Sequence, residues 1–372
     1  MTTGSHPARL GVRGREIKIS RCESGFTPVQ RTPWCCANDR CSPIQPFGKP
    51  IATAQMLPST LSSRYQVLRE LRPASTSARG VWLVVDRASG QRSVLKCAPA
   101  RALAPAQVLA HLRAYSPSEQ HLLLPCEQGV IDDSVSFERT EVPFEEVSDL
   151  QALGMSAQWS TIGTRVVEQV AEALAAIHTA RGGLWVLHGD INPSNVIASR
   201  ARGSEWTFHL ADFDAALLVN DYATTQPRPA RVTLRYASPE ALGGGQLNPV
   251  ADYWSLGMLV FEALLGSHPF EHWTDVQQRS AVVGAWQPDL GRIESNEWRA
   301  LARGLLRRDP DTRWKRTEVE GWLRGDPAVI SNGLTSREEP ATSTPFNVAG
   351  IPVYSAESLA RVALRHWQVV TR

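Results

Sequence analysis

The spacing of hydrophobic residues changes part way along the chain, and this change constrains the fold more than any other feature. Before residue 158, the short runs 65–71, 80–86 and 92–97 have the composition of β-strands. After it, apolar residues recur at helical spacing, most regularly over 161–179. A strand-rich part followed by a helix-rich part predicts an α+β protein of two lobes, and a cleft between lobes is a common place for a ligand.

Composition excludes several classes of protein. Of 372 residues, 42% are hydrophobic and 20% are charged, which is typical of a globular chain rather than a disordered one. The formal net charge of +2 gives no general attraction to nucleic acid or anionic lipid. No apolar run is long enough to span a membrane, and the first 30 residues hold no apolar signal core. We therefore expect a cytoplasmic protein with neither a nucleic-acid nor a membrane partner.

Residues 1–60 are predicted to form a basic, disordered leader, because they are rich in Pro, Ser, Thr, Arg and Cys without a sustained hydrophobic period. Met56 is an alternative start of translation. Zinc binding by the leader is a second interpretation, but two of its cysteines are adjacent, which fits C-x-x-C spacing poorly. Four of the six cysteines lie here: Cys22, Cys35, Cys36 and Cys41.

The other boundaries also follow from composition. Residues 61–325 form the predicted two-lobed domain. Residues 326–344 are polar and rich in Pro, Ser and Thr, which is typical of a linker. Residues 345–372 are predicted to be an amphipathic helical tail, with apolar residues on one side of 355–369. This tail could dock a partner or pack on the larger lobe.

Two polar motifs in the second half of the chain combine the groups that phosphoryl transfer requires. Residues 188–195 read H-G-D-I-N-P-S-N, and residues 210–214 read L-A-D-F-D. Phosphoryl transfer needs an acid to orient the attacking hydroxyl, oxygen ligands for magnesium and a cation on the phosphates. Asp190 can supply the acid, and Asn195 and Asp212 can supply the ligands. Lys96, one of four lysines beside 35 arginines, can supply the cation from an apolar strand.

These motifs resemble those of a eukaryotic-type Ser/Thr protein kinase of the bacterial kind, over about residues 65–324. Lys96 matches the lysine of V-A-I-K, Asp190 and Asn195 match H-R-D-L-K-P-x-N, and Asp212 matches D-F-G. Three further segments follow in the family's order: T-L-R-Y-A-S-P-E at 233–240, D-Y-W-S-L-G at 252–257 and D-P-D-T-R at 309–313. The order and spacing of these segments are more specific than any one of them.

The resemblance implies a bilobal protein-kinase-like fold, with a small β-rich N-lobe and a large helical C-lobe. It implies an ATP- and Mg²⁺-dependent enzyme that phosphorylates a hydroxyl of a protein substrate. In that enzyme Asp190 orients the hydroxyl, Lys96 holds the α- and β-phosphates, and Asn195 and Asp212 bind the metal.

Three further residues take roles from the resemblance. Gly80 and Val81 fall in the loop and strand that cover the nucleotide. Thr233 is expected to touch Asp190 and to favour an aliphatic hydroxyl over tyrosine.

Several positions depart from the family's pattern. The phosphate loop, L-R-P-A-S-T-S-A-R-G-V at 71–81, holds a single glycine, and glycines let backbone amides approach phosphates. Residues 101–118 hold no Asp or Glu, so the acid that pairs with Lys96 in the family is absent, and Gln107 is the nearest polar replacement. Gly189 replaces the arginine that clamps a phosphorylated activation loop.

Two more departures lie beside the predicted site. Asn192 replaces the lysine that approaches the transferring phosphate, and Asp214 replaces the glycine of D-F-G. The departures leave two alternatives open. One is a pseudokinase that acts as a binding or scaffold module. The other is a small-molecule kinase resembling aminoglycoside phosphotransferases, which share H-G-D-x-x-P-x-N but lack the segments matched at 233–240 and 252–257.

Overall fold

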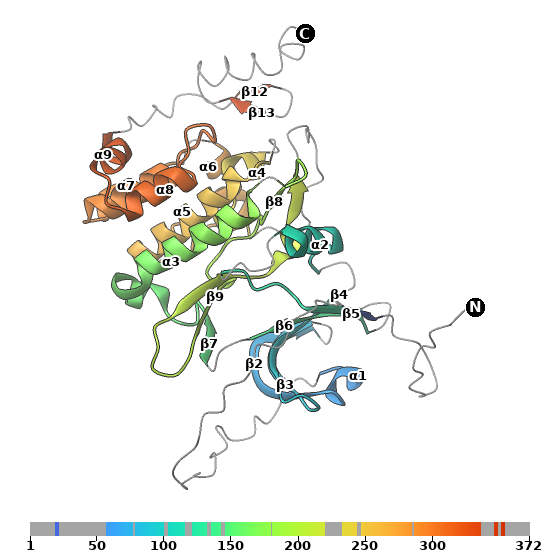
Figure 1. Cartoon of the computed structure of the whole chain (residues 1–372). Helices are drawn as coiled ribbons and strands as arrows, with labels where there is room; N and C mark the ends of the chain where they lie inside the picture. The colour runs from blue at the N-terminus through green and yellow to red at the C-terminus, as the bar shows by residue number, and fades with distance from the viewer. Residues whose placement is uncertain are drawn as a thin grey trace. The chain divides into compact units, whose positions relative to one another are not determined.

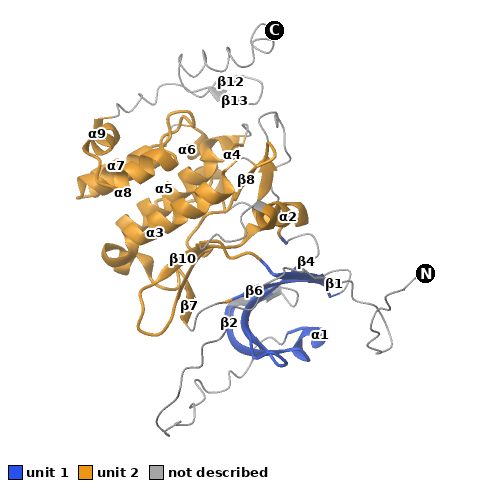
Figure 2. Cartoon of the chain, viewed as in Figure 1, with its two compact units in different colours: residues 1–103, 125–141 blue, residues 104–124, 142–372 orange. Residues whose placement is uncertain are grey.

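The chain divides into two compact units, which Figure 2 colours separately. Unit 1 comprises residues 1–103 and 125–141, and unit 2 comprises residues 104–124 and 142–372. One unit is built on a β-sheet and the other is mainly helical, which confirms the predicted α+β class. The computed structural model describes residues 19–21, 57–76, 79–99, 103–115, 121–131, 135–142, 146–179, 181–219, 233–243, 247–284, 286–335, 346–348 and 351–353.

Unit 1 is an antiparallel sheet of six strands in the order β1-β5-β6-β4-β3-β2 (Figure 1). The strands predicted at 65–71, 80–86 and 92–97 are confirmed as β2, β3 and β4. The elements are β1 (Ile19–Arg21), α1 (Ser59–Ser62), β2 (Tyr65–Thr76), β3 (Arg79–Asp86), β4 (Arg92–Pro99), β5 (Glu127–Val130) and β6 (Val135–Glu141).

One face of this sheet carries the hydrophobic core of unit 1. Trp82, Leu95 and Phe137 are buried there, and burial raises the pKa of the Cys97 thiol to about 12. Gly80 belongs to the same packing, because a Cβ at this position would lie 2.4 Å from the Trp82 ring. The strand therefore needs a residue without a side chain here to make room for the indole.

Unit 2 is mainly helical and, in its described part, carries three small sheets, ordered β10-β9-β7, β11-β8 and β12-β13. Its core packs the apolar faces of α3 and α5, with Val166 and Leu174 from α3 and Leu256 from α5 fully buried. The helices are α2 (Ala106–Tyr115), α3 (Met155–Ile177), α4 (Pro239–Gly243), α5 (Val250–Leu265), α6 (Asp275–Val283), α7 (Asn296–Leu305), α8 (Arg316–Leu323) and α9 (Pro327–Thr335). The strands are β7 (Glu146–Asp149), β8 (Trp185–Leu187), β9 (Val196–Arg200), β10 (Thr207–Leu210), β11 (Leu217–Val219), β12 (Phe346–Val348) and β13 (Ile351–Val353), and the 3₁₀ turns are η1 (Phe213–Ala215), η2 (Leu234–Tyr236) and η3 (Leu290–Arg292).

The predicted linker is corrected in its first part, because Pro327–Thr335 is the helix α9. The Asp326 carboxylate accepts a hydrogen bond of 2.9 Å from the Ala328 amide, and proline at the first helical position is pre-set for a helix. The helix lies close to α7, since a Cβ on Gly333 would be 2.7 Å from the Ala300 Cβ. Three apolar side chains of the helix pack against the core: Val329, Ile330 and Leu334. The residues between and around them are small or polar, and this composition suggests a linker in the sequence.

The tail and the leader also differ from expectation where they are described. Phe346–Val348 and Ile351–Val353 form an antiparallel hairpin, where a helical tail is predicted. The helical pattern at 355–369, Met56 and the four leader cysteines lie outside the described residues. In the predicted leader, Ile19–Arg21 pairs with β5, and Leu57 is buried in the core of unit 1. The ordered part of unit 1 thus extends before residue 61.

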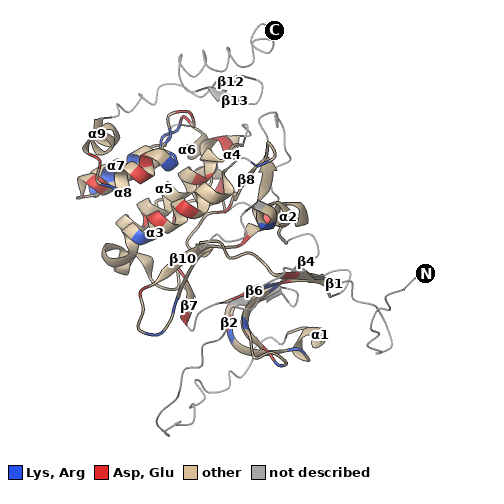
Figure 3. Ribbon diagram, viewed as in Figure 1, with Lys and Arg blue, Asp and Glu red and all other residues tan. Residues whose placement is uncertain are grey.

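Charged residues of both signs are interspersed along α3, α7 and α8 (Figure 3). Arg316 and Glu320 on α8, for example, form an exposed pair one helical turn apart. In the described part of the chain, no helix combines the length and hydrophobicity needed to cross a membrane.

His268 is a buried histidine of unit 2 whose surroundings favour its neutral form. Its side chain is 5% exposed and lies beside the rings of Tyr236 and Phe270. The Phe270 amide donates to Nδ1 at 3.1 Å, so Nε2 carries the hydrogen and donates to the Arg235 carbonyl at 3.1 Å. Burial, and then the charge of Arg235, lower the pKa of His268 to about 4.

We expect this histidine to make the protein less stable in acid. The unfolded chain takes up a proton near pH 6.5, whereas the folded chain does so only near pH 4. The unfolded state therefore binds more protons between these values, and stability falls as the pH is lowered through them, by about 3 kcal/mol at most. Urea unfolding at several pH values between 7 and 4 measures this slope. His268→Gln can keep both hydrogen bonds and should flatten the slope; equal slopes for the variant and the wild type would contradict the assignment.

Candidate active site

The two polar motifs lie on loops that the small sheets of unit 2 bring together. Residues 188–195 connect β8 to β9, and Ala211 and Asp212 follow β10. Strands β9 and β10 are antiparallel, with Val196 opposite Leu210, so the start of β9 and the end of β10 are neighbours. The Ala211 amide donates to the Asn195 carbonyl at 2.9 Å. The sheet thus places Asp212 one residue from this contact.

Asp190 is the centre of a hydrogen-bond network. Its Oδ1 accepts from the Thr233 amide at 2.9 Å, and its Oδ2 accepts from the Asn195 Nδ2 at 3.1 Å. The Asp190 carbonyl accepts from Asn195 Nδ2 at 2.8 Å and from Asn192 Nδ2 at 3.1 Å. Donors thus hold both carboxylate oxygens, so the side chain has a fixed direction while remaining only half-buried. A carboxylate held in this way can still accept a further hydrogen bond from a hydroxyl.

Asn195 and Asp212 supply the kind of oxygen atoms that magnesium prefers. The Asn195 amide nitrogen is occupied by Asp190, so its side-chain oxygen is the atom suited to a cation. Asp212 has a φ of 66°, the only left-handed backbone among the described non-glycine residues. Such strain is concentrated at functional sites.

The donor set fits a shared magnesium site rather than a closed one. Among the described residues, no group of three or more His, Cys, Asp or Glu side chains is close enough to hold a metal. Magnesium commonly takes one or two protein oxygens together with phosphate oxygens and water. Asn195 and Asp212 would therefore hold the ion jointly with a bound phosphate compound.

Asp252, at the start of α5, fixes the loop that carries Asp190. Its carboxylate accepts from the amides of His188 and Gly189 at 2.8 and 2.9 Å, and it contacts His178 Nε2 at 2.8 Å. The side chain is 1% exposed, so these bonds are shielded from water.

The backbone conformation at position 189 favours glycine. Its φ is 77°, and a Cβ would lie 3.0 Å from the Ala215 carbonyl oxygen. A side chain would therefore strain the loop at this position. The backbone is thus unfavourable for the arginine that protein kinases, which the sequence resembles, have at this position.

Thr233 contacts Asp190 as predicted, but it does so through its backbone amide. Its side-chain oxygen lies 3.5 Å from Asn192 Nδ2, at the limit of a hydrogen bond. Thr233 is exposed and precedes the turn η2, which packs against the core of unit 2 through Tyr236.

The other predicted site residues belong to unit 1. Lys96 lies on β4, between Val81 on β3 and Glu138 on β6 in the strand register. Val81 is thus the direct cross-strand neighbour of Lys96, whereas Gly80 faces the hydrophobic core beside Trp82. Gln107, the expected replacement for the missing helix acid, belongs instead to unit 2, where it is an exposed residue of α2.

Glu240 and Arg313 form a buried ion pair. Two hydrogen bonds of 2.6 and 3.0 Å join the guanidinium to the carboxylate, and the side chains are 1% and 0% exposed. Arg313 also donates to the carbonyls of Arg307, Arg308 and Val250. The pair ties the segment after Thr233 to the chain that leads into α8.

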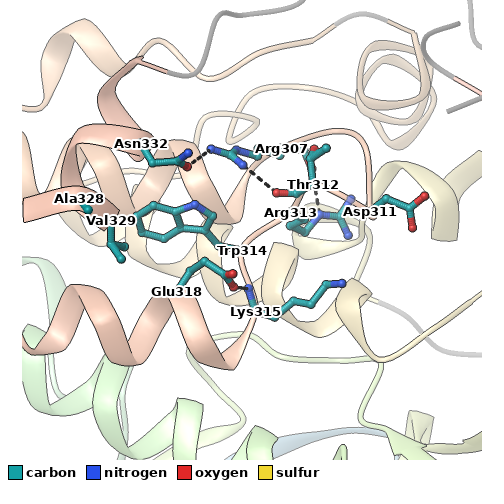
Figure 4. Close-up of a pocket in the computed structure, with 10 residues that line it drawn as sticks. All are labelled: Arg307, Asp311, Thr312, Arg313, Trp314, Lys315, Glu318, Ala328, Val329 and Asn332. Carbon is teal, nitrogen blue, oxygen red and sulfur yellow. Dashed lines mark hydrogen bonds between the residues drawn. The ribbon is translucent and has the colours of Figure 1, made fainter. Parts of the chain in front are cut away.

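A pocket of about 440 Å³ lies beside this ion pair, between the start of α8 and α9 (Figure 4). Within it, Arg307 donates to the Thr312 carbonyl at 2.8 Å and to Asn332 Oδ1 at 2.9 Å. The lining residues are Arg307, Asp311, Thr312, Arg313, Trp314, Lys315, Glu318, Ala328, Val329 and Asn332. None of them belongs to the loops that carry Asp190 and Asp212, so this pocket is not the predicted site.

His178 and Gln151 support the Asp190 loop, but no motif predicts either of them. His178 follows α3 and contacts Asp252. Gln151 accepts from the Ser194 hydroxyl at 2.7 Å. Gln151 lies 43 positions from Ser194 and His178 lies 74 positions from Asp252 in the sequence, so only the fold brings these partners together.

A model of the protein kinase domain family matches residues 142–321, just under half of the chain. This region lies within unit 2. It includes Asp190, Asn195, Asp212 and Thr233, whereas the site residues predicted in unit 1 lie outside it.

Three curated proteins illustrate the likeness. The serine/threonine-protein kinase PknJ of Mycobacterium tuberculosis is 38% identical over 105 residues, which are 28% of this chain and 17% of that protein. The serine/threonine-protein kinase PknF of the same species is 33% identical over 129 residues, 34% of this chain and 26% of that protein. Aurora kinase A-A of Xenopus laevis is 33% identical over 181 residues, 47% of this chain and 39% of that protein. The chain thus spans well under half the length of these relatives.

Proposed function

We propose that this chain, whose residues 142–321 match the protein kinase domain family, transfers the γ-phosphate of ATP to a serine or threonine of a protein substrate in the cytoplasm. The observation that carries the proposal is the fixed carboxylate of Asp190, with a donor on each oxygen. Its loop is tied to α5 by the buried Asp252.

Asp190 is the residue that would orient the acceptor. Its carboxylate accepts the hydrogen of the substrate hydroxyl and aligns the oxygen for attack, as phosphoryl transfer requires. Thr233 and Asn195 hold the carboxylate in one orientation, so little reorganisation is needed when the substrate binds.

Asn195 and Asp212 would hold the magnesium ion, which neutralises charge on the phosphates of ATP when it is bound. The Asn195 side-chain oxygen and the Asp212 carboxylate are hard oxygen ligands on adjoining loops. Lys96 would neutralise the α- and β-phosphates from β4. Val81, its neighbour on β3, would pack against the nucleotide base, and Gly80 directly precedes it on the same strand.

A binding experiment tests the metal assignment. Asp212→Asn removes a negative oxygen from the cation site, so we expect the affinity for ATP in the presence of Mg²⁺ to fall at least about tenfold, or about 1.4 kcal/mol. Isothermal titration calorimetry with and without Mg²⁺ measures this change. Asp275→Asn, an exposed change on α6, is the control. Unaltered affinity and metal dependence in Asp212→Asn would refute the assignment.

Thr233 should matter much less than Asp190 to the reaction rate. It holds Asp190 through its backbone amide, which Thr233→Ala retains. We expect this variant to lower kcat by less than about tenfold, since only a weak side-chain contact is lost. The initial rate of peptide phosphorylation measures the effect, with Thr233→Ser as the conservative control. A loss as large as that of Asp190→Asn would show that the hydroxyl itself takes part in the reaction.

A further inference from the structure

The pocket between the start of α8 and α9 contains no residue of the loops that carry Asp190 and Asp212 (Figure 4). Its volume of about 440 Å³ is within the range of pockets that bind small organic molecules. The match to the protein kinase domain family ends at residue 321, whereas α9, which contributes one wall of the pocket, begins at Pro327. The pocket is therefore completed by a helix outside the family match.

One wall of the pocket is apolar and closely packed. Trp314 is 1% exposed, and its ring lies so close to α7 that a Cβ on Gly304 would be 2.1 Å from it. Val329 of α9 packs against α8, since a Cβ on Gly321 would be 2.7 Å from the valine side chain. Ala328 lines the pocket beside Val329. These side chains can contact an apolar group without rearranging first.

The same wall contains a hydrogen-bond donor without an acceptor. The indole Nε1 of Trp314 is buried and has no hydrogen-bond partner in the described part of the chain. An indole N–H can only donate, so it requires an acceptor atom. A buried donor without one costs free energy that a hydrogen bond would recover. A ligand oxygen that reached Trp314 would supply this acceptor.

Two lining residues bring positive charge to the pocket. Arg307 donates to the Thr312 carbonyl and to Asn332 Oδ1, and burial lowers its pKa in spite of the opposing charge of Glu318. A further negative charge nearby would therefore stabilise the guanidinium. Lys315 is exposed and is the single lysine in the sequence of unit 2, in a chain with 35 arginines. Its ammonium is a compact charge on a flexible stem, which can follow a small anion.

The other charges of the lining do not cancel these two. Arg313 is neutralised by Glu240 in the buried ion pair. The Glu318 carboxylate accepts from the Lys315 amide at 2.9 Å, at the N-terminal end of α8, where a negative charge is favourable. Asp311 is exposed and opposes one positive charge at most. The lining therefore favours an anion over a cation.

We propose that this pocket binds a small carboxylic acid with an apolar body, of about the size of an arylacetic acid. The apolar body would lie against Trp314 and Val329, and the carboxylate would interact with Lys315 and with the charge of Arg307. Because Arg307 also bonds the Thr312 carbonyl, a bound acid would stabilise the turn between α7 and α8. The proposal is separate from phosphate transfer, since no lining residue belongs to the candidate active site.

Calorimetric titration of the full chain with three probes tests this site. Phenylacetate has both the charge and the apolar body, phenylacetamide lacks the charge, and acetate lacks the apolar body. We expect phenylacetate to bind at least about tenfold more tightly than either of the other two. At ten times its dissociation constant, it should raise the thermal midpoint of the chain by about 2–4 °C.

Three variants locate the bound probe. Lys315→Gln should weaken the binding of phenylacetate about fivefold or more, and Lys315→Arg should retain most of the affinity. Arg324→Gln, at the other end of α8, is the matched control for the loss of one positive charge. Ala328→Phe fills the pocket from an exposed position on α9 and should abolish binding.

The proposal would be overturned by equal affinities for the three probes, or by no binding of phenylacetate below about 10 mM. Equal effects of Lys315→Gln and Arg324→Gln, or binding retained in a folded Ala328→Phe, would also contradict it. Loss of binding in Lys96→Met, a change in the other unit, would place the probe at a different site. If Ala328→Phe fails to fold, the comparison of Lys315→Gln with Arg324→Gln still decides, because both changes are at exposed positions.

Discussion

Replacing Asp190 by asparagine should lower the rate of phosphate transfer about a thousandfold, or about 4 kcal/mol of barrier. The carboxylate accepts hydrogen bonds on both oxygens, from Thr233 and Asn195, and the substrate hydroxyl needs a third acceptor position. An asparagine side chain presents a donor where one of these acceptors stands. The acceptor hydroxyl then loses its orientation, while the Asp252 contacts that hold the loop remain.

Initial rates under saturating ATP and Mg²⁺ measure this effect. The thermal midpoint of the same preparation is the control for folding, and Asp275→Asn is the control for the loss of one negative charge. A variant that folds normally and retains a tenth or more of the rate would contradict the role of Asp190. Such a result would also remove the main support for the proposed function.

The second large effect concerns stability. Glu240→Gln leaves the Arg313 guanidinium buried without its counter-charge, so we expect the free energy of unfolding to fall by about 3–5 kcal/mol. Urea unfolding of the full chain, followed by tryptophan fluorescence, measures the change. Glu320→Gln is the matched control, because its pair with Arg316 on α8 is exposed and should contribute less than about 1 kcal/mol.

A double variant distinguishes the effect of an unpaired buried charge from the effect of lost packing on the free energy of unfolding. Glu240→Met/Arg313→Met removes both charges and replaces them by apolar side chains, so it should recover much of the stability lost in Glu240→Gln. If the double variant is less stable than Glu240→Gln, the contacts of Arg313 with the Val250, Arg307 and Arg308 carbonyls are the larger contribution.

Local patterns predict the fold where one face of an element is apolar. The strand-like composition of β3 and β4 and the helical spacing in α3 are strong enough to predict these elements correctly, because the side chains involved form the cores. Helix α9 is missed, since Ser331, Asn332 and Gly333 separate two of its packed side chains from the third and its close contact with α7 depends on Gly333. Glycine gives no hydrophobic signal, so a contact of this kind is visible only in three dimensions.

The residues of the candidate site also differ in whether the sequence predicts them. Asp190, Asn195 and Asp212 lie in short motifs whose order identifies them, and the sheet β9-β10 brings their loops together. The partner of Asp252 cannot be found by spacing, because His178 lies 74 positions from it in the sequence.

The most direct test of the central claim is transfer of labelled γ-phosphate from ATP by the purified full chain. The acceptors are a mixed peptide library with Ser, Thr and Tyr and, separately, an aminoglycoside. We expect Mg²⁺-dependent phosphoserine and phosphothreonine in the wild type and neither in Asp190→Asn. Label on the aminoglycoside or on tyrosine alone, or nucleotide binding without any transfer, would contradict the assignment of this chain as a Ser/Thr protein kinase.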